Sequence, residues 1–435
     1  MSSGLNIKNN NKYVLLKGLK RSINLNYELF IAKRIIADKK YKNSISSPII
    51  KIAITAIALG VIIMLIAIAT GAGLQHKIRD KIAGFKGHVQ IVNYDTNNSN
   101  ISTVPIKINQ DFYPDFNGIE GIKNIQVFAN KAGLLRTKTD FEGIVFKGVS
   151  TDYDWTFFKE YLIAGRIPNL NLTRTKEVLL SQKITNRLNL QLNDTILATF
   201  LKTSTSKLPS NRKYIIVGIY NSGFTEFDNT MMIGDLREVQ NLNKWSRNEV
   251  GGFEVLLDDF NTIEKKGKEI YSQIGATLNS KTILEINPAV FEWIQLFDNN
   301  IWFIIVIMIL VAGINMITAL LVLILKRVQM IGILKALGGT NYSIRKIFLY
   351  NASYLILKGL FWGNMIGLSV IFIQYYFKLI VLDPETYYVT TMPVYITLNN
   401  VLLLNIGTLL ISFLMLIIPS YIITKIQPST SIKFA

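Results

Sequence analysis

Few side chains in this sequence could carry out bond-making chemistry. It has two histidines, His76 and His88, and no cysteine among 435 residues, so the usual Cys and His ligands of a zinc site are missing. It contains no GxxxxGK[ST] phosphate loop and no GxSxG nucleophile elbow, the motifs of ATP binding and of α/β-hydrolase catalysis. We therefore expect no enzyme, no metal site and no cofactor bound by this chain, and we expect both histidines to be structural or surface residues.

The most unusual pattern is a short apolar and basic segment, MIGILKALGG, at residues 330–339. Its Gly338-Gly339 pair predicts the end of a short helix. The apolar residues of this helix need a receptor, and we expect no cytosolic domain in the chain to supply one. The segment is therefore predicted to dock in a groove of another polypeptide.

The elements that would position this helix are four long apolar runs. Half of the residues are hydrophobic, and they are concentrated at residues 52–70, 301–325, 361–377 and 401–424. Because about 20 helical residues cross the hydrocarbon of a bilayer, we predict an α-helical membrane protein with four transmembrane helices. The first helix is separated from the other three by a large mixed α+β extracytoplasmic domain.

Lysine and arginine near the ends of these runs predict the orientation. Residues 1–51 hold eleven Lys and Arg against two acids, and residues 326–348 hold five with no acid, whereas residues 379–398 carry two acids, Asp383 and Glu385, and no Lys or Arg. Both termini are therefore expected in the cytoplasm. The predicted segments are 1–47 (cytoplasmic, with an amphipathic helix), 48–73 (helix 1), 74–295 (periplasmic domain), 296–325 (helix 2), 326–348 (cytoplasmic loop), 349–378 (helix 3), 379–398 (periplasmic loop), 399–424 (helix 4) and 425–435 (cytoplasmic tail).

The same asymmetry explains the net charge of +18. Residues 74–295 contain 27 Lys and Arg against 24 Asp and Glu, so most of the excess lies beside the membrane and favours anionic lipid over nucleic acid. The basic amphipathic stretch at residues 27–40 is expected to lie along the cytoplasmic leaflet or to pack on a partner subunit, and the two are compatible.

The predicted outer domain has strand-like runs at residues 89–92, 143–149, 178–180, 214–220 and 253–257. Residues 261–274 favour a helix with Asn261 as a possible cap. Between strand-like runs, residues 201–213 are polar and contain Pro209, so an exposed loop or hairpin arm is expected.

The order of one helix, a large outer domain and three helices resembles permease subunits of the ABC transporters that release lipoproteins from the bacterial inner membrane. More distant relatives are the macrolide-efflux and cell-division permeases of the same superfamily. The motifs that carry the resemblance are GLQHKIRDKIAGFKGHVQI, KEVLLSQKITNRLNLQLNDTI, KYIIVGIYNSGFTEFD, MIGILKALGGTNYSIRKIF, LDPETYYVTTMPV and PSYIITKIQPSTSIKF. Lys326 and Met330 depart from the family, which usually has acids at these two positions.

The resemblance implies a permease without catalytic activity that couples ATP hydrolysis to lipoprotein extraction. Its partners would be two copies of a cytosolic ATPase, which binds ATP and Mg, a second permease copy or paralogue, the lipoprotein, membrane lipid and a periplasmic chaperone. An inserted part of the outer domain is expected at about 131–214. The docking or coupling helix would comprise Met330, Ile331, Gly332, Ile333, Leu334, Lys335, Ala336, Leu337 and Gly338. A chaperone-binding arm would include Lys202, Lys207, Pro209 and Arg212.

Polarity and the expected topology also suggest candidates for an acyl-chain cavity, namely Met64, Ile68, Phe303 and Ile307, although ordinary helix or lipid contacts explain them equally well. Two other functions stay open. A regulator of periplasmic hydrolases, as among the cell-division relatives, would have a much smaller outer domain. An efflux permease of the macrolide-exporter type would usually carry a fused ATPase, which this sequence does not contain.

The charge asymmetry makes the topology testable. A reporter fused after Lys281 should read as periplasmic, and one fused after Gly339 should read as cytoplasmic. Alkaline phosphatase and fluorescent-protein fusions at the two positions measure this. The same compartment for both fusions would overturn the four-helix arrangement.

Overall fold

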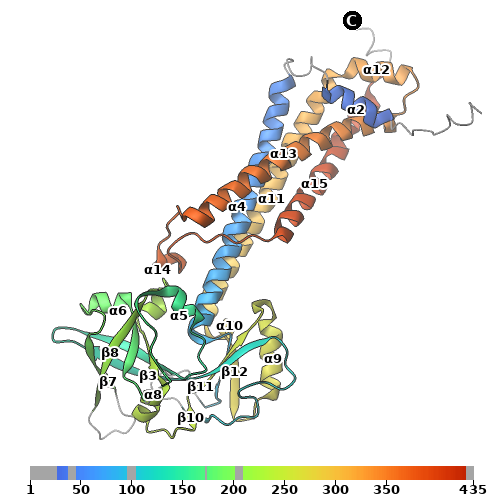
Figure 1. Ribbon diagram of the computed structural model, residues 1–435. Coiled ribbons are helices and arrows are strands. Elements are labelled where there is room, and N and C mark those ends of the chain that lie inside the picture. The colour runs from blue at the N-terminus through green and yellow to red at the C-terminus, as the bar shows by residue number, and fades with distance from the viewer. Residues whose placement is uncertain (1–26, 38–45, 96–103, 172–173, 201–208, 428–435) are drawn as a thin grey trace, which may run out of the picture. The chain divides into compact units, whose positions relative to one another are not determined.

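The computed structural model describes residues 27–37, 46–95, 104–171, 174–200 and 209–427 (Figure 1). The chain divides into two compact units. Unit 1 comprises Met1–Ala67, Trp302–Val370 and Thr397–Ala435, and unit 2 comprises Ile68–Ile301 and Ile371–Ile396. The arm residues Lys202 and Lys207 lie outside the described residues.

Four helices are long and apolar enough to cross a membrane. They are α4 (Ser46–Lys86), α11 (Pro288–Lys326), α13 (Asn341–Phe377) and α15 (Leu398–Ser420), which is followed by the short α16 (Ile422–Lys425). The predicted fold class is confirmed, but α4, α11 and α13 are longer than the apolar runs from which they were predicted. Helix α4 continues past Gly73 because Ile78, Ile82 and Phe85 recur on one buried face.

In unit 1, α13 packs closely against α4 through Gly359, Gly363 and Gly367, which are spaced one helical turn apart. A Cβ atom at Gly363 would lie 2.7 Å from Val61, so the absence of a side chain lets the two backbones approach. On α13, Asn364 exchanges amide hydrogen bonds of 2.6 and 2.9 Å with Asn405 of α15.

Unit 2 is built on a ten-stranded sheet with a separate two-stranded sheet, β2 and β10. The strands are β1 (Val89–Asn93), β2 (Ile106–Lys107), β3 (Ile122–Arg136), β4 (Phe141–Val149), β5 (Leu162–Gly165), β6 (Glu177–Ser181), β7 (Thr195–Phe200), β8 (Ser210–Tyr220), β9 (Met231–Asp235), β10 (Glu249–Val250), β11 (Gly252–Leu257) and β12 (Leu278–Thr282). All five predicted runs are strands, namely β1, β4, β6, β8 and β11.

Six of these strands close into a ring. Strand β3 pairs with β4, β4 with β9, β9 with β6, β6 with β8, β8 with β7, and β7 returns to β3. The rings of Phe146, Phe200 and Tyr214 pack together in its core. Strands β11, β1 and β12 extend the sheet from β3. The expected boundary at residue 214 therefore falls inside β8 and does not coincide with a break in the sheet.

Short helices complete unit 2. They are α5 (Thr156–Tyr161), α6 (Gln182–Arg187), α7 (Thr225–Asp228), α8 (Leu236–Asn243), α9 (Ile263–Gln273), α10 (Ile283–Ile286) and α14 (Pro384–Tyr387). The predicted helix at 261–274 is α9, but the expected cap was wrong. Asn261 lies within a 3₁₀ turn, Phe260–Thr262, and it is Asp259 whose carboxylate accepts from the backbone N–H of Asn261.

The end of α4 is capped inside unit 2 by a buried lysine. Lys147 Nζ donates to the carbonyl oxygen of Phe85 at 2.5 Å and to both carboxylate oxygens of Glu254 at 2.7 and 2.8 Å. Both charged side chains are only 1% exposed. Burial lowers the pKa of Lys147, and the charge of Glu254 opposes this effect. The amides of Gln90 and Gln126 donate to the same carboxylate.

This cluster predicts a large stability difference between single and double variants. Lys147→Met leaves the buried carboxylate of Glu254 without its counter-charge, which should cost about 3 to 5 kcal/mol of unfolding free energy. The double variant with Glu254→Gln should recover a large part of the loss. Denaturant titration of the full-length protein in detergent, followed by tryptophan fluorescence, measures both. Lys213→Met, at an exposed lysine of β8, is the control, and a single Lys147→Met variant as stable as this control would contradict the prediction.

Candidate functional site

The predicted docking helix is present as α12, Val328–Ala336. One of its faces packs within the chain against α2, Tyr27–Ala37. Met330 and Leu334 of α12 pack against a buried cluster formed by Ala32 and Ile35 of α2 with Ile347 of α13. The expectation that another polypeptide supplies the receptor for the apolar residues was therefore wrong for this face. Helix α2 therefore packs on its own chain, with its apolar side chains buried against those of α12 and α13.

The C-terminal end of α12 is also held by the chain. Lys335 Nζ donates to the carbonyl oxygens of Ile423 at 2.8 Å and Ile426 at 2.7 Å, which satisfies acceptors at the end of α16. Gly338 adopts a left-handed conformation with φ of +89°, and the N–H of Gly339 donates to the carbonyl of Leu334 at 2.8 Å. The glycine pair thus ends the helix as the sequence predicted.

Another side of α12 keeps a narrow stripe of apolar side chains exposed. Ile331 and Gly332 are buried, whereas Ile333 is 47% and Leu337 is 80% exposed. Ala336 lies between them and is also exposed. Because positions three and four apart share one helix face, these three side chains form a continuous surface, which we call the α12 stripe.

The predicted arm begins from a regular hairpin ladder. Strands β7 and β8 pair from Thr195 opposite Ile215 to Phe200 opposite Ser210. Pro209 is exposed and Arg212 is half-buried opposite Ala198. Arg212 therefore belongs to the ladder, so its role differs from that expected for a residue of a free loop.

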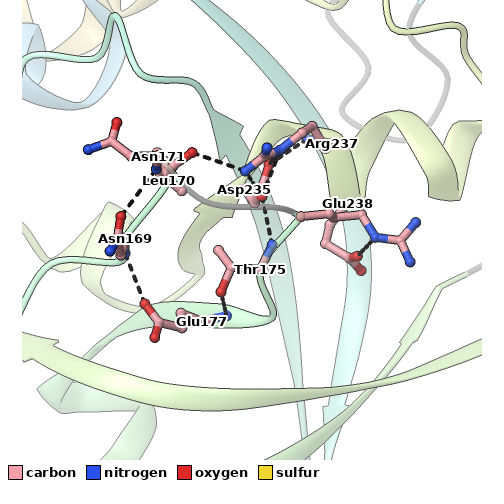
Figure 2. Close-up of polar contacts among 9 residues, drawn as sticks. Asn169, Leu170, Asn171, Thr175, Glu177, Asp235, Arg237 and Glu238 are labelled. Carbon is pink, nitrogen blue, oxygen red and sulfur yellow. Dashed lines mark hydrogen bonds and ion pairs between the residues drawn. The ribbon is translucent and has the colours of Figure 1, made fainter.

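A polar cluster joins residues 169–171 and 174–177 to α8 (Figure 2). The carboxylate of Asp235 caps α8, accepting from the N–H of Arg237 at 2.8 Å and from that of Thr175 at 2.9 Å. Glu238 pairs with Arg174 at 2.7 Å and accepts from the hydroxyl of Tyr214 in β8 at 3.3 Å. These contacts join α8 to β8, so we assign the cluster to holding the strands of the ring in place.

The four acyl-chain candidates differ in exposure. Met64 is fully buried and Ile68 is half-buried, whereas Phe303 and Ile307 are exposed. Met64 is thus enclosed by its own chain's helices, and a lipid could reach it only if those helices moved.

The two histidines have structural surroundings. The ring of His76 stacks on Tyr395 with centroids 5.0 Å apart. His88 Nδ1 accepts from the backbone N–H of Leu257 at 2.9 Å, and burial lowers its pKa to about 4. No group of three metal-ligating side chains occurs within the described ranges.

Sequence patterns could have revealed part of what was missed. The G-x₃-G-x₃-G spacing of Gly359, Gly363 and Gly367 is a known signal for close helix packing in membranes. By contrast, no local sequence pattern predicts the hydrogen bonds of Lys335 to residues about 90 positions later, because the fold of unit 1 brings these distant segments together.

Comparison with known proteins agrees with this architecture. Residues 52–271, about half of the chain, match the family model of the MacB-like periplasmic core domain, and residues 302–428 match that of the FtsX-like permease C-terminal region. The lipoprotein-releasing system transmembrane protein LolC of Neisseria meningitidis is 20% identical over 94% of this chain and 99% of its own length. LolC of Buchnera aphidicola is 22% identical over 92% of this chain and 97% of its own length. LolE of Haemophilus influenzae is 19% identical over 93% of this chain and 99% of its own length. Among solved structures, the periplasmic region of MacB from Actinobacillus actinomycetemcomitans is similar to 48% of this chain over 95% of its own length. The sequence identity is 14% and the TM-score is 0.33.

The chain belongs to the family of membrane permeases that have a MacB-like periplasmic core domain and an FtsX-like C-terminal region. Within that family it is an ABC permease of the LolC and LolE type, because these relatives align with more than nine-tenths of its length. The resemblance seen in the sequence motifs is thereby confirmed. The chain is a multi-pass protein of the inner membrane.

Proposed function

We propose that this chain is the permease subunit of an ATP-driven transporter that extracts lipoproteins from the inner membrane and passes them to a periplasmic chaperone. The full-length relatives named for lipoprotein release support the substrate class. Removing a lipid anchor costs about 0.8 kcal/mol per CH₂, so two or three acyl chains need an external energy source. A separate cytosolic ATPase, in two copies and binding ATP with Mg, supplies it. A second permease copy or paralogue completes the transporter.

The observation that carries the proposal is the α12 stripe. Ile333, Ala336 and Leu337 are an exposed apolar surface on a helix whose other face is held by α2. The stripe is the docking surface for the ATPase and lies on the cytoplasmic side, whereas the ten-stranded sheet lies in the periplasm. The charge asymmetry of the loops supports this orientation.

The contacts of α12 suggest how a displacement of this helix by the ATPase would reach the other helices of unit 1. Lys335 ties α12 to the end of α16, and Arg345 at the start of α13 donates to Ser420 Oγ of α15 at 3.1 Å and covers the ring of Tyr421. These contacts link α12, α13 and α15 at this end. We propose that this linkage transmits the state of the ATPase to the membrane helices.

Leu337→Asp tests the docking surface. A charge in the centre of the interface should weaken ATPase binding by about 2 to 4 kcal/mol, roughly 30-fold to 1,000-fold. Co-purification of the ATPase from membranes measures the loss. The matched control is Thr340→Asp, which adds the same charge at an exposed polar position beyond the helix.

Leu334→Asp is a poorer test, because Leu334 packs on α2 and its loss would disturb the chain itself. If the Leu337→Asp variant inserts normally in the membrane and recovers as much ATPase as the Thr340→Asp control, the α12 stripe is not the docking site.

The arm that starts from β7 and β8 is proposed to capture the chaperone. Lys202, Lys207 and Arg212 would favour an acidic patch on that partner, and a passive loop is the alternative. Deleting residues 204–208 stops short of the pair between Phe200 and Ser210, so folding should persist, since surface loops tolerate changes of length. Chaperone recovery in a pull-down should be lost while ATP hydrolysis continues. Deletion of residues 97–101, of equal length elsewhere in the outer domain, is the control, and equal recovery by the two deletions would reject the role.

A further inference from the structure

A pocket of about 580 Å³ lies in unit 2 where two apolar runs end. It is lined by Gly73, three residues after the run at 52–70, by Tyr375 and Tyr376 at the end of the run at 361–377, and by residues 389–395 of the connection to α15. Because both runs span hydrocarbon, their common end places the pocket at the boundary between hydrocarbon and headgroups. Tyrosines are typical of that boundary.

The polar lining carries more positive than negative charge. Its ammonium groups are those of Lys77, Lys81 and Lys378, and its carboxylate is that of Glu160. Lys77 pairs with Glu160 at 3.0 Å, and Lys81 donates to the carbonyl of Tyr388 at 3.0 Å. The ammonium of Lys378 has no hydrogen bond or ion pair with any residue that the structure describes.

Two further carboxylates lie near these lysines but do not line the pocket. Asp80 lies 3.6 Å from His76, and buried Asp228 accepts from the hydroxyl of Ser222 at 2.7 Å. The hydroxyls of Thr390 and Thr391 also line the pocket. The lining thus combines cations and hydroxyl donors, the groups that bind phosphate oxygens.

Exposed apolar residues stand close in the chain to residues that line the pocket. Next to Lys378 and Tyr376 in the chain stand Phe372, Phe377, Leu379 and Val381, each 64 to 73% exposed. Exposed apolar side chains of this size need an apolar partner. At the end of two membrane-spanning runs that partner is the acyl region of a lipid.

The walls are fixed by contacts within the protein. Gln374 donates to the carbonyl of Met392 at 3.0 Å and accepts from the N–H of Ile380 at 3.2 Å. The N–H of Tyr395 donates to the carbonyl of Ala69 at 2.8 Å. The pocket is therefore formed before any ligand enters, which reduces the entropic cost of binding.

We propose that this pocket binds the phosphate-bearing headgroup of a membrane phospholipid, with the acyl chains lying over the exposed apolar residues next to Lys378 and Tyr376 in the chain. Lys378 and Lys77 contact the phosphate. This inference goes beyond the proposed function because it is independent of the substrate that the permease moves and of ATPase docking.

Native mass spectrometry of the full-length chain in detergent tests the headgroup. The probes are palmitoyl-oleoyl phosphatidylglycerol, the diacylglycerol with the same acyl chains, and glycerol 3-phosphate. We expect phosphatidylglycerol to be retained at least about tenfold better than diacylglycerol, and we expect the Lys77→Gln/Lys378→Gln variant to lose about tenfold of that retention. The double variant Lys265→Gln/Lys268→Gln, on α9, is the matched control and should behave as wild type. Equal retention of the two lipids, or equal retention by the two double variants, overturns the proposal. Displacement of the lipid by millimolar glycerol 3-phosphate would assign the pocket to a free phosphate compound and would also overturn it.

A second measurement does not depend on the folding of the lysine variants. A photo-crosslinking amino acid at Tyr376, which is 72% exposed, should capture phospholipid in intact membranes. The same amino acid at Tyr271, an exposed tyrosine of α9, should not. Capture of protein alone at Tyr376 would overturn the proposal.

Discussion

The buried ammonium of Lys147 fixes where helix α4 ends inside the outer domain. The last carbonyl groups of any helix lack partners within the helix and must find other donors when water is excluded. Here Lys147 donates to Phe85, and Gly87, with φ of +69°, donates its N–H to Ala83 at 2.8 Å. The charge of Lys147 is in turn balanced by Glu254. A helix that begins among the apolar residues of unit 1 is thereby anchored in the core of unit 2.

The register of the sheet brings this cluster together. Gln90 of β1 lies opposite Glu254 of β11, and Glu254 lies opposite Gln126 of β3. Strand β4, the next neighbour of β3, supplies Lys147. A slip of one residue would turn these side chains to the other face of the sheet and leave Lys147 buried without its counter-charge. Since buried ion pairs add little net stability, we infer that the cluster serves mainly to select one register.

The sequence alone predicts the elements of this fold better than their contacts. The membrane helices follow from run length against bilayer thickness, and β1, β4, β6, β8 and β11 follow from their β-branched residues. The pairing of β7 with both β3 and β8 closes a ring between distant segments, and no local pattern encodes it. The docking helix was found because its glycine pair is a local signal. Helix α2 was predicted as well, but its contact with α12 was not, because that contact joins residues separated by about 300 positions of the chain.

The two ends of α13 are each fixed by different neighbours. At its start, Ile347 packs with Ala32 and Ile35 of α2, beside α12. After its end, the connection to α15 is part of the core of unit 2, since Val389 is buried there and Tyr388 stacks on Phe224 with centroids 4.9 Å apart. Under the proposed function, this covalent continuity makes α13 the route by which a displacement of α12 would reach the connection held in the outer domain. The glycines along its middle let it pack on α4, whose own end is held by Lys147, so α4 and α13 reach the outer domain through separate anchors.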